Sequence, residues 1–182
     1  MSKPIHLFVS SSPDLAPERE ALGQAVAELP ISLGWEVRHT PGPGEKIDEA
    51  LDFIESGDLY LFVLGADFAA PMGLEWGGAL GTGQPVLAYR KRVLHSPSAQ
   101  TLLRHSDVAW TPFESPQELK TLVTRALARI LLDREEQWGL HLDEVEALLT
   151  LVGTEEETPA EPDRRRGAGR DGVILGRGRE HE

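Results

Sequence analysis

The chain has 182 residues, 40% of them hydrophobic, a length that suits one substantial core better than two, so we expect a single domain. Its formal net charge of −12 repels phosphodiester backbones and argues against nucleic-acid binding, while the lack of cysteine excludes disulfides and the scattered histidines give no metal-ligand spacing. Without an apolar run of about 18 residues, and with Met1 leading directly into a strand-like segment, we expect a soluble cytoplasmic protein with neither a membrane span nor a secretory signal.

Residues 1–57 are typical of two strand and helix units. An apolar run ends in a polar segment at residues 10–14, which predicts a buried strand, a loop and a helix start. The Pro-Gly-Pro-Gly run at residues 41–44 fits neither a helix nor a central strand and predicts a loop. The elements expected here are a strand at 5–9, a helix at 15–29, a strand at 35–39, the loop at 41–44 and a helix that ends at Gly57.

The rest of the apolar sequence continues this alternation. Residues 59–64 are too continuously apolar for a surface strand and should form the centre of the sheet. Ser115, Pro116 and Glu118 combine an N-cap, a proline at the first helical position and a capping-box glutamate, which predicts a helix start. The expected elements are a strand at 59–64, a helix at 72–82, a strand at 84–89, a helix at 98–104, a strand at 107–110, a helix from 116 to 132 and an extra helix at 143–152.

Strands and helices that alternate at this spacing predict a three-layer α/β sandwich of the flavodoxin-like, or Rossmann-like, kind. Its sheet should be five-stranded and parallel, in the order 2-1-3-4-5, with right-handed crossovers. The domain is expected to span residues 1–152. Residues 153–182 combine acidic residues, prolines, glycines and an arginine run, which predicts a flexible charged tail or linker. The chain is also compatible with being part of a larger protein.

The predicted topology indicates where a ligand would bind. In an open parallel sheet, ligands bind outside the carboxyl ends of the strands where the strand order reverses, here between the first and third strands. The loop after the first strand offers consecutive hydroxyls and a helix start, which suit a phosphate or a sugar hydroxyl, although the same residues also suit plain helix capping. The predicted ligand-binding residues are Ser10, Ser11, Ser12, Asp14, Gly65, Phe68 and Gly73.

Glu75 is the strongest candidate for a chemical role. A carboxylate one turn inside a helix among Gly and Ala is unusual, because its small neighbours leave space above it for a ligand. In the alternative interpretation, Glu75 complements the helix N-terminus and the glycines let the helix lie close to the sheet. Trp76 should point about 100° away from Glu75 and belong to the core or an interface, so Phe68 is the predicted base-stacking group.

Two segments resemble known families. Residues 73–86, GLEWGGALGTGQPV, resemble the signature of the nucleoside 2-deoxyribosyltransferase-like superfamily, and within it the deoxynucleoside 5′-monophosphate N-glycosidases. Residues 9–20 instead resemble an uncharacterised TIR-related family of bacterial signalling and defence proteins. The resemblance covers roughly residues 5–132. The chain lacks the acidic residue that precedes a Gly-Thr pair in the transferases, and it lacks the glycine-rich first loop of the monophosphate hydrolases.

The resemblance implies cleavage of an N-glycosidic bond in a nucleotide-type ligand, either a nucleoside monophosphate or NAD, with no cofactor and no metal. It gives Glu75 the role of nucleophile or stabiliser of the oxocarbenium ion. A carboxylate suits this role because breaking a ribosyl C–N bond builds positive charge at the anomeric carbon. Asp67 is the predicted second carboxylate, with Asp14 behind it.

Two other hypotheses stay open. The enzyme hypothesis requires an open cleft over Glu75 with a second polar group in reach. The chain could instead be a catalytically silent TIR-like module that senses a nucleotide or assembles through its surfaces, in which case Glu75 could be buried in an ion pair with Arg19 or Arg90. Alternatively, chemistry could arise only in a homo-oligomer whose neighbouring subunit completes the pocket. The run at residues 90–92 is predicted to be a solubilising strand exit, with a phosphate grip as the alternative.

Overall fold

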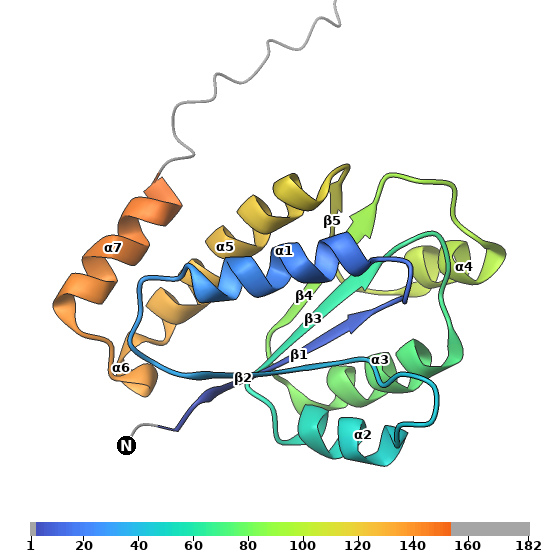
Figure 1. Ribbon diagram of the computed structural model, residues 1–182, viewed down its shortest axis with the longest axis horizontal. Helices are drawn as coiled ribbons and strands as arrows, with labels where there is room; N and C mark the ends of the chain where they lie inside the picture. Colours follow the sequence, from blue (N-terminus) through green and yellow to red (C-terminus); the bar gives the residue numbers. More distant parts are fainter. Residues whose placement is uncertain (1–2, 154–182) are drawn as a thin grey trace, which may run out of the picture.

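The computed structural model describes residues 3–153 and has a five-stranded parallel sheet in the order β2-β1-β3-β4-β5 (Figure 1). The strand order predicted from the sequence is therefore confirmed. The strands are β1 (Ile5–Ser11), β2 (Trp35–His39), β3 (Leu59–Leu64), β4 (Val86–Lys91) and β5 (Trp110–Phe113). The helices are α1 (Ala16–Ala27), α2 (Ile47–Glu55), α3 (Ala70–Thr82), α4 (Pro97–His105), α5 (Pro116–Asp133), α6 (Glu135–Trp138) and α7 (Leu142–Gly153).

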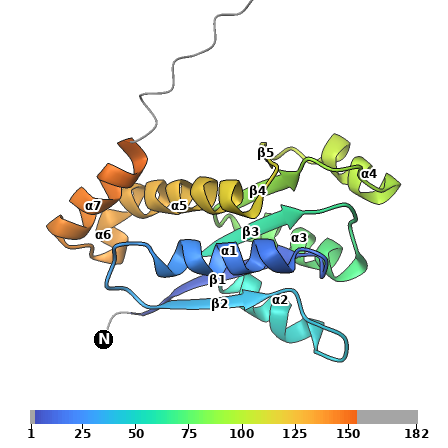
Figure 2. The same ribbon diagram turned by 45° about the horizontal axis from the view of Figure 1, so that its top comes forward.

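The helices lie in two layers on opposite faces of the sheet (Figures 1 and 2). Helices α1 and α5 pack side by side on one face, with α7 against α5, whereas α2 and α3 pack together on the other. The strand β3 is buried on both faces because its side chains alternate between the two cores. Leu59, Leu61 and Val63 join the α1/α5 core, and Tyr60, Phe62 and Leu64 join the α2/α3 core.

The start of α5 follows the predicted capping pattern. The Ser115 hydroxyl accepts a hydrogen bond from the Glu118 backbone N–H at 3.2 Å, and the Glu118 carboxylate accepts one from the Glu114 N–H at 2.8 Å. Pro116 occupies the first turn, where its missing N–H costs nothing. The last predicted helix is also present as α7, which begins one residue earlier than expected.

Several predicted boundaries are wrong by a few residues. The fifth strand lies at Trp110–Phe113 rather than 107–110, and it contains Pro112. Proline is tolerated there because β5 is the edge strand. The first strand extends through Ser11, since Ser10 and Ser11 pair with Phe62 and Val63 of β3. The fourth strand extends to Lys91, so the basic run at 90–92 begins inside the sheet.

The tail predicted for residues 153–182 lies outside the described residues, except for Gly153 at the end of α7. Within residues 3–153, no helix is long and apolar enough to cross a membrane. The same part of the chain contains no group of three or more His, Asp or Glu side chains placed to hold a metal ion.

Candidate functional site

Glu75 lies where the sheet reverses its strand order, enclosed by residues from β1 and from the loop that follows β2. Its side chain projects from α3 toward the carboxyl end of β1 and is 0% exposed. The Ser10 hydroxyl donates a hydrogen bond to Glu75 Oε2, and the Thr40 hydroxyl donates to the same oxygen at 2.9 Å. Ser10 faces this layer because side chains alternate along β1, and Phe8 belongs to the same core.

The second carboxylate oxygen of Glu75, Oε1, is buried without a hydrogen-bond partner within the described structure. Burial raises the pKa of Glu75 above its ordinary value, because a charged carboxylate loses its hydration. The hydrogen bonds from Ser10 and Thr40 oppose this shift of the pKa. Burial therefore favours the neutral form of Glu75, while the hydrogen bonds from both hydroxyls favour its anion.

Glu75 differs from the other buried glutamates of residues 3–153. Glu18 pairs with the Lys91 ammonium at 2.6 Å. Glu144 accepts hydrogen bonds from the backbone N–H groups of Ser32 and His141, the latter at 2.8 Å. These two carboxylates join separate elements and have the amide or cationic partners that a structural carboxylate requires. Glu75 has only hydroxyl partners, so its burial has no comparable structural explanation.

A tyrosine lies in the same environment. Tyr60 of β3 is 0% exposed. Burial raises the pKa of its phenol well above the ordinary value; a contact with Ser10 opposes the shift, and the charge of Glu75 adds to it. The phenol is thus a neutral group near Glu75, and its hydroxyl is buried without a hydrogen-bond partner among the described residues. It stands at a sheet-centre position where a purely apolar side chain would be expected.

A cavity of about 550 Å³ opens beside this buried cluster, at the carboxyl end of β2. Thr40 forms the wall between the two, because it lines the cavity, accepts a hydrogen bond from the Ser11 N–H at 3.0 Å and donates to Glu75. The loop that joins β2 to α2 in Figure 1 supplies much of the lining. The volume suits a small-molecule ligand.

The open hollow predicted directly above Glu75 is absent from the described structure, since Glu75 is 0% exposed. Protein fills the space beside Gly73 and Gly78, whereas a Cβ at Gly77 would meet nothing within 4 Å. A Cβ at Gly78 would lie 3.6 Å from Leu51 of α2, and one at Gly73 would lie 3.5 Å from the Phe68 ring. These glycines therefore let neighbouring groups approach α3 closely, as in the alternative interpretation. Thr40 closes the remaining side of Glu75.

The predicted residues of the first loop remain together around the end of β1. Ser11 and Ser12 are each 3% exposed, and neither hydroxyl has a hydrogen-bond partner within the described residues. Asp14 is exposed. A Cβ at Gly65 would lie 3.1 Å from both Asp14 Oδ2 and Ser12 Oγ, so glycine there permits the close approach of the first and third strand ends.

Asp67 forms its hydrogen bonds with residues other than Glu75. Its exposed carboxylate accepts a hydrogen bond from the Ser96 hydroxyl, which also caps α4. This bond, with a further one from the Phe68 backbone, holds the pKa of Asp67 below its ordinary value. A carboxylate that holds its proton so weakly is a poor general acid. The contacts therefore favour a structural role for Asp67 over the predicted catalytic one.

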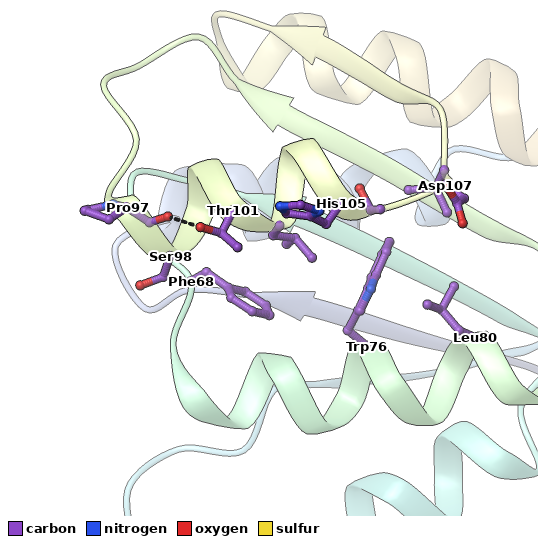
Figure 3. Close-up of a pocket in the computed structure, with 11 residues that line it drawn as sticks. Phe68, Trp76, Leu80, Pro97, Ser98, Thr101, His105 and Asp107 are labelled. Atoms are coloured by element: carbon purple, nitrogen blue, oxygen red, sulfur yellow. Dashed lines mark hydrogen bonds between the residues drawn. The ribbon is translucent and has the colours of Figure 1, made fainter.

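Phe68 and Trp76 belong to a different cavity, of about 840 Å³, between α3 and α4. Figure 3 shows both rings directed into it, with Thr101 and His105 on the opposite side. Trp76 is 7% exposed and stacks on Trp110 at 5.6 Å between ring centroids, in agreement with the expected core position. Phe68 packs at 6.1 Å from Phe62, so its predicted stacking role would apply to this cavity and not to Glu75.

The basic residues near the site do not neutralise Glu75. Across residues 3–153, neither Arg19 nor Arg90 forms an ion pair with it. Arg19 instead donates to the carbonyl oxygens of Ser12, at 2.8 Å, and Pro13, at 3.3 Å. The buried ion pair that a purely structural role for Glu75 would need is therefore missing from the described part of the chain.

The sequence predicted Ser10 and Glu75 as site residues and named Arg19 only as a possible ion-pair partner of Glu75. It missed Thr40, His39 and Tyr60. The omission has a simple origin. The predicted switch point involves only the loops after the first and third strands, although β2 is the other neighbour of β1 and ends at the same edge. A polar pair directly after the second strand was the signal that could have identified His39 and Thr40.

Comparisons with known proteins show no family for this chain. No family model and no curated protein matches the chain. Among solved structures, it is similar to the metal-soaked flavodiiron core of Flv1 from Synechocystis sp. PCC6803, with 11% sequence identity and a TM-score of 0.44. The match covers 71% of this chain and 37% of that one, and at this level it carries no information on chemistry. The strand order itself defines a flavodoxin-like α/β domain.

Proposed function

We propose that this domain binds a nucleotide-type ligand at the carboxyl edge of β1 and β2 and cleaves its N-glycosidic bond through Glu75. One observation carries the proposal: Glu75 is a buried carboxylate with only hydroxyl partners, at the place where ligands bind in sheets of this topology. Burying a carboxylate without a cation or amide partner costs free energy. Such costs concentrate at functional sites, where a perturbed pKa serves chemistry.

The proposed reaction is hydrolysis of the bond between the anomeric carbon and the base nitrogen. The base leaves with the electron pair of the C–N bond, and water supplies a hydroxyl group to the carbon. The remaining proton of the water goes to a departing purine or pyrimidine base, or to solvent when nicotinamide leaves NAD already neutral. Positive charge develops on the anomeric carbon as the bond breaks, and the Glu75 carboxylate stabilises it or captures it covalently before water attacks. Exclusion of bulk water would strengthen this interaction.

Because Thr40 covers Glu75, which is 0% exposed, the proposal includes movement of the β2–α2 loop. In the open conformation, the Thr40 hydroxyl would donate its hydrogen bond to the ligand instead of to Glu75. Hydroxyl groups of the bound sugar would then donate to Glu75 in its place. Residues 42–46 of this loop are exposed and include two glycines, one of which, Gly44, has a φ of 88°. These properties suit a loop that opens and closes over a site.

A nucleotide-sensing module without chemistry is the second candidate. Within residues 3–153, the hydrogen-bond partners of Glu75 are the hydroxyls of Ser10 and Thr40, and Asp67 is bonded to Ser96 instead. Glu75 therefore has no second carboxylate as a hydrogen-bond partner in this part of the chain. In this alternative, ligand binding moves the β2–α2 loop, and the movement itself is the signal.

To test this proposal, wild type, Glu75→Gln and Glu144→Gln are each incubated with NAD and with a panel of nucleoside monophosphates. Chromatography then measures the base that each protein releases. We expect release by wild type and a loss of at least about 100-fold in Glu75→Gln, as for removal of a group that stabilises transition-state charge. Glu144→Gln, also a buried glutamate, should keep activity at temperatures where it remains folded. Equal release by wild type and Glu75→Gln would contradict the enzyme proposal. Ligand binding without release would favour the sensing module.

A further inference from the structure

The cavity beside Thr40 has a basic lining, although the protein as a whole carries a net charge of −12. Arg19 lines it from α1, and Arg38 and His39 line it from β2. Glu45, which accepts a hydrogen bond from the Gly42 N–H at 2.8 Å, is the carboxylate among the lining residues. Two guanidinium groups and one imidazole therefore share this cavity with one carboxylate, in a molecule that is acidic as a whole.

Arg19 is the cation of this cavity whose charge is not compensated. Its guanidinium donates to two backbone carbonyls, which fix its position without neutralising it. Arg38, in contrast, pairs with Glu36 at 2.9 Å and lies 4.5 Å from the Phe53 ring centroid. No ion pair of the described residues includes Arg19. A fixed guanidinium with free donor capacity suits an oxyanion.

Ser11 supplies an independent indication of a ligand. Ser11 is one of the residues that line the cavity and is 3% exposed, yet its hydroxyl is buried without a hydrogen-bond partner among the residues described. A buried hydroxyl without a partner is costly, and a ligand that reached it when the β2–α2 loop moves would remove that cost. The adjacent Ser10 already binds Glu75, so Ser11 carries the β1 hydroxyl that is left without a partner.

His39 responds to the same charge. Much of the residue is exposed, but partial desolvation of its imidazole lowers the His39 pKa, and the positive charge of Arg19 lowers it further. The two groups therefore lie close enough to repel when both are charged. An anion bound between them would relieve this repulsion and raise the pKa of His39.

We propose that Arg19, Ser11 and His39 form a phosphate site, so that the ligand of this domain is a phosphorylated nucleoside or a dinucleotide rather than a free nucleoside. The inference rests on the proposed function for the position of the sugar, which Thr40 would place between the phosphate and Glu75. The volume of about 550 Å³ leaves space for a phosphate and a ribose together.

The test is calorimetric binding of ADP-ribose, ribose 5-phosphate, ribose and inorganic pyrophosphate to the full chain, combined with a proton NMR titration of His39, whose signals His39→Gln assigns. Variants are Arg19→Gln, Arg19→Lys and Ser11→Ala. The matched control is Arg104→Gln, an exposed arginine of α4 that also donates to a backbone carbonyl, at 3.2 Å, and does not line this cavity. We expect ribose 5-phosphate to bind at least 10-fold more tightly than ribose and to raise the His39 pKa. Arg19→Gln should remove that preference, Arg19→Lys should restore part of it, and Arg104→Gln should leave it unchanged.

Equal binding of ribose and ribose 5-phosphate would overturn the inference, as would a preference that survives in folded Arg19→Gln. An unchanged His39 titration in the presence of bound ligand would also overturn it. The proposed function fails separately: phosphate-dependent binding with no base release leaves the phosphate site standing and removes the chemistry. Base release that is equally fast from a nucleoside and from its monophosphate would keep the proposed chemistry and remove the phosphate site.

Discussion

At the scale of single residues, the difference between Glu75 and Glu144 shows how environment assigns roles to identical side chains. Glu144 accepts backbone N–H groups at both oxygens, and these bonds hold its pKa below the ordinary value, with the His141 amide as the largest cause. Glu75 has its pKa raised, chiefly by burial. The charged carboxylate of Glu144 therefore stabilises the folded protein, whereas the charged carboxylate of Glu75 destabilises it.

The raised pKa of Glu75 makes a signed prediction about stability. Because the folded protein binds this proton more tightly than the unfolded chain, stability should fall as pH rises from the ordinary value of 4.5 through the raised folded pKa. Each pKa unit of the shift corresponds to about 1.4 kcal/mol. Urea unfolding at several pH values should show this loss in wild type and not in Glu75→Gln. A loss of equal size in both proteins would contradict the prediction.

Glu144 should give the opposite dependence. Its lowered folded pKa contributes stability that is present above the ordinary value of 4.5 and is lost as pH falls through the folded pKa. Glu144→Gln should therefore be less stable than wild type near neutral pH, with the difference shrinking in acid. The same urea series measures it, and a difference that grows on acidification would be the opposite of the expected result.

At the scale of elements, local chemistry predicted where helices begin better than where strands end. Ser115, Pro116 and Glu118 specify the start of α5 through bonds within one turn. The ends of β1 and β5 depend instead on pairing with a neighbouring strand, which local sequence does not encode, and so Ser10, Ser11 and Pro112 were placed outside strands. The closure of Thr40 over Glu75 is likewise a contact between distant segments.

Removal of the α5 cap tests the value of that local signal. Ser115→Ala deletes the acceptor for the Glu118 N–H and should destabilise the protein by about 1 kcal/mol. Ser98→Ala, at an exposed serine inside α4, should change stability by less than about 0.5 kcal/mol. Chemical denaturation of both variants gives the comparison, and equal effects would show that the cap contributes nothing particular to Ser115.

At the scale of the whole molecule, the order of the five strands follows from alternation of strands and helices and was predictable, whereas the site was predictable only in part. The sheet topology brings Ser10 and Glu75 to one edge, as expected. Whether that edge is open depends on how the β2–α2 loop packs, which no periodicity reveals. Helix α7 adds a further long-range feature, since Glu144 ties it to Ser32 and Leu148 packs in the core.

Docking of α7 can be measured with two adjacent leucines. Leu148 is 0% exposed and Leu149 is 54% exposed. Leu148→Ala should cost about 2–5 kcal/mol because it leaves a cavity in the α1/α5 core. Leu149→Ala should stay within about 0.5 kcal/mol of wild type. Thermal and urea unfolding of the two variants supply the values, and a small effect of Leu148→Ala would mean that α7 is not part of the folded core.

The proposed function depends most on the pKa of the Glu75 carboxyl in the folded protein. Carbon-13 NMR of protein labelled at the glutamate side-chain carboxyl can follow its titration, with the signal assigned by its absence from Glu75→Gln. We predict a midpoint above the ordinary pKa of 4.5 for Glu75 and a midpoint below that value for Glu144 in the same spectra. A Glu75 midpoint at or below 4.5 would show that its carboxylate is fully compensated by the fold, and it would contradict the functional role given to it.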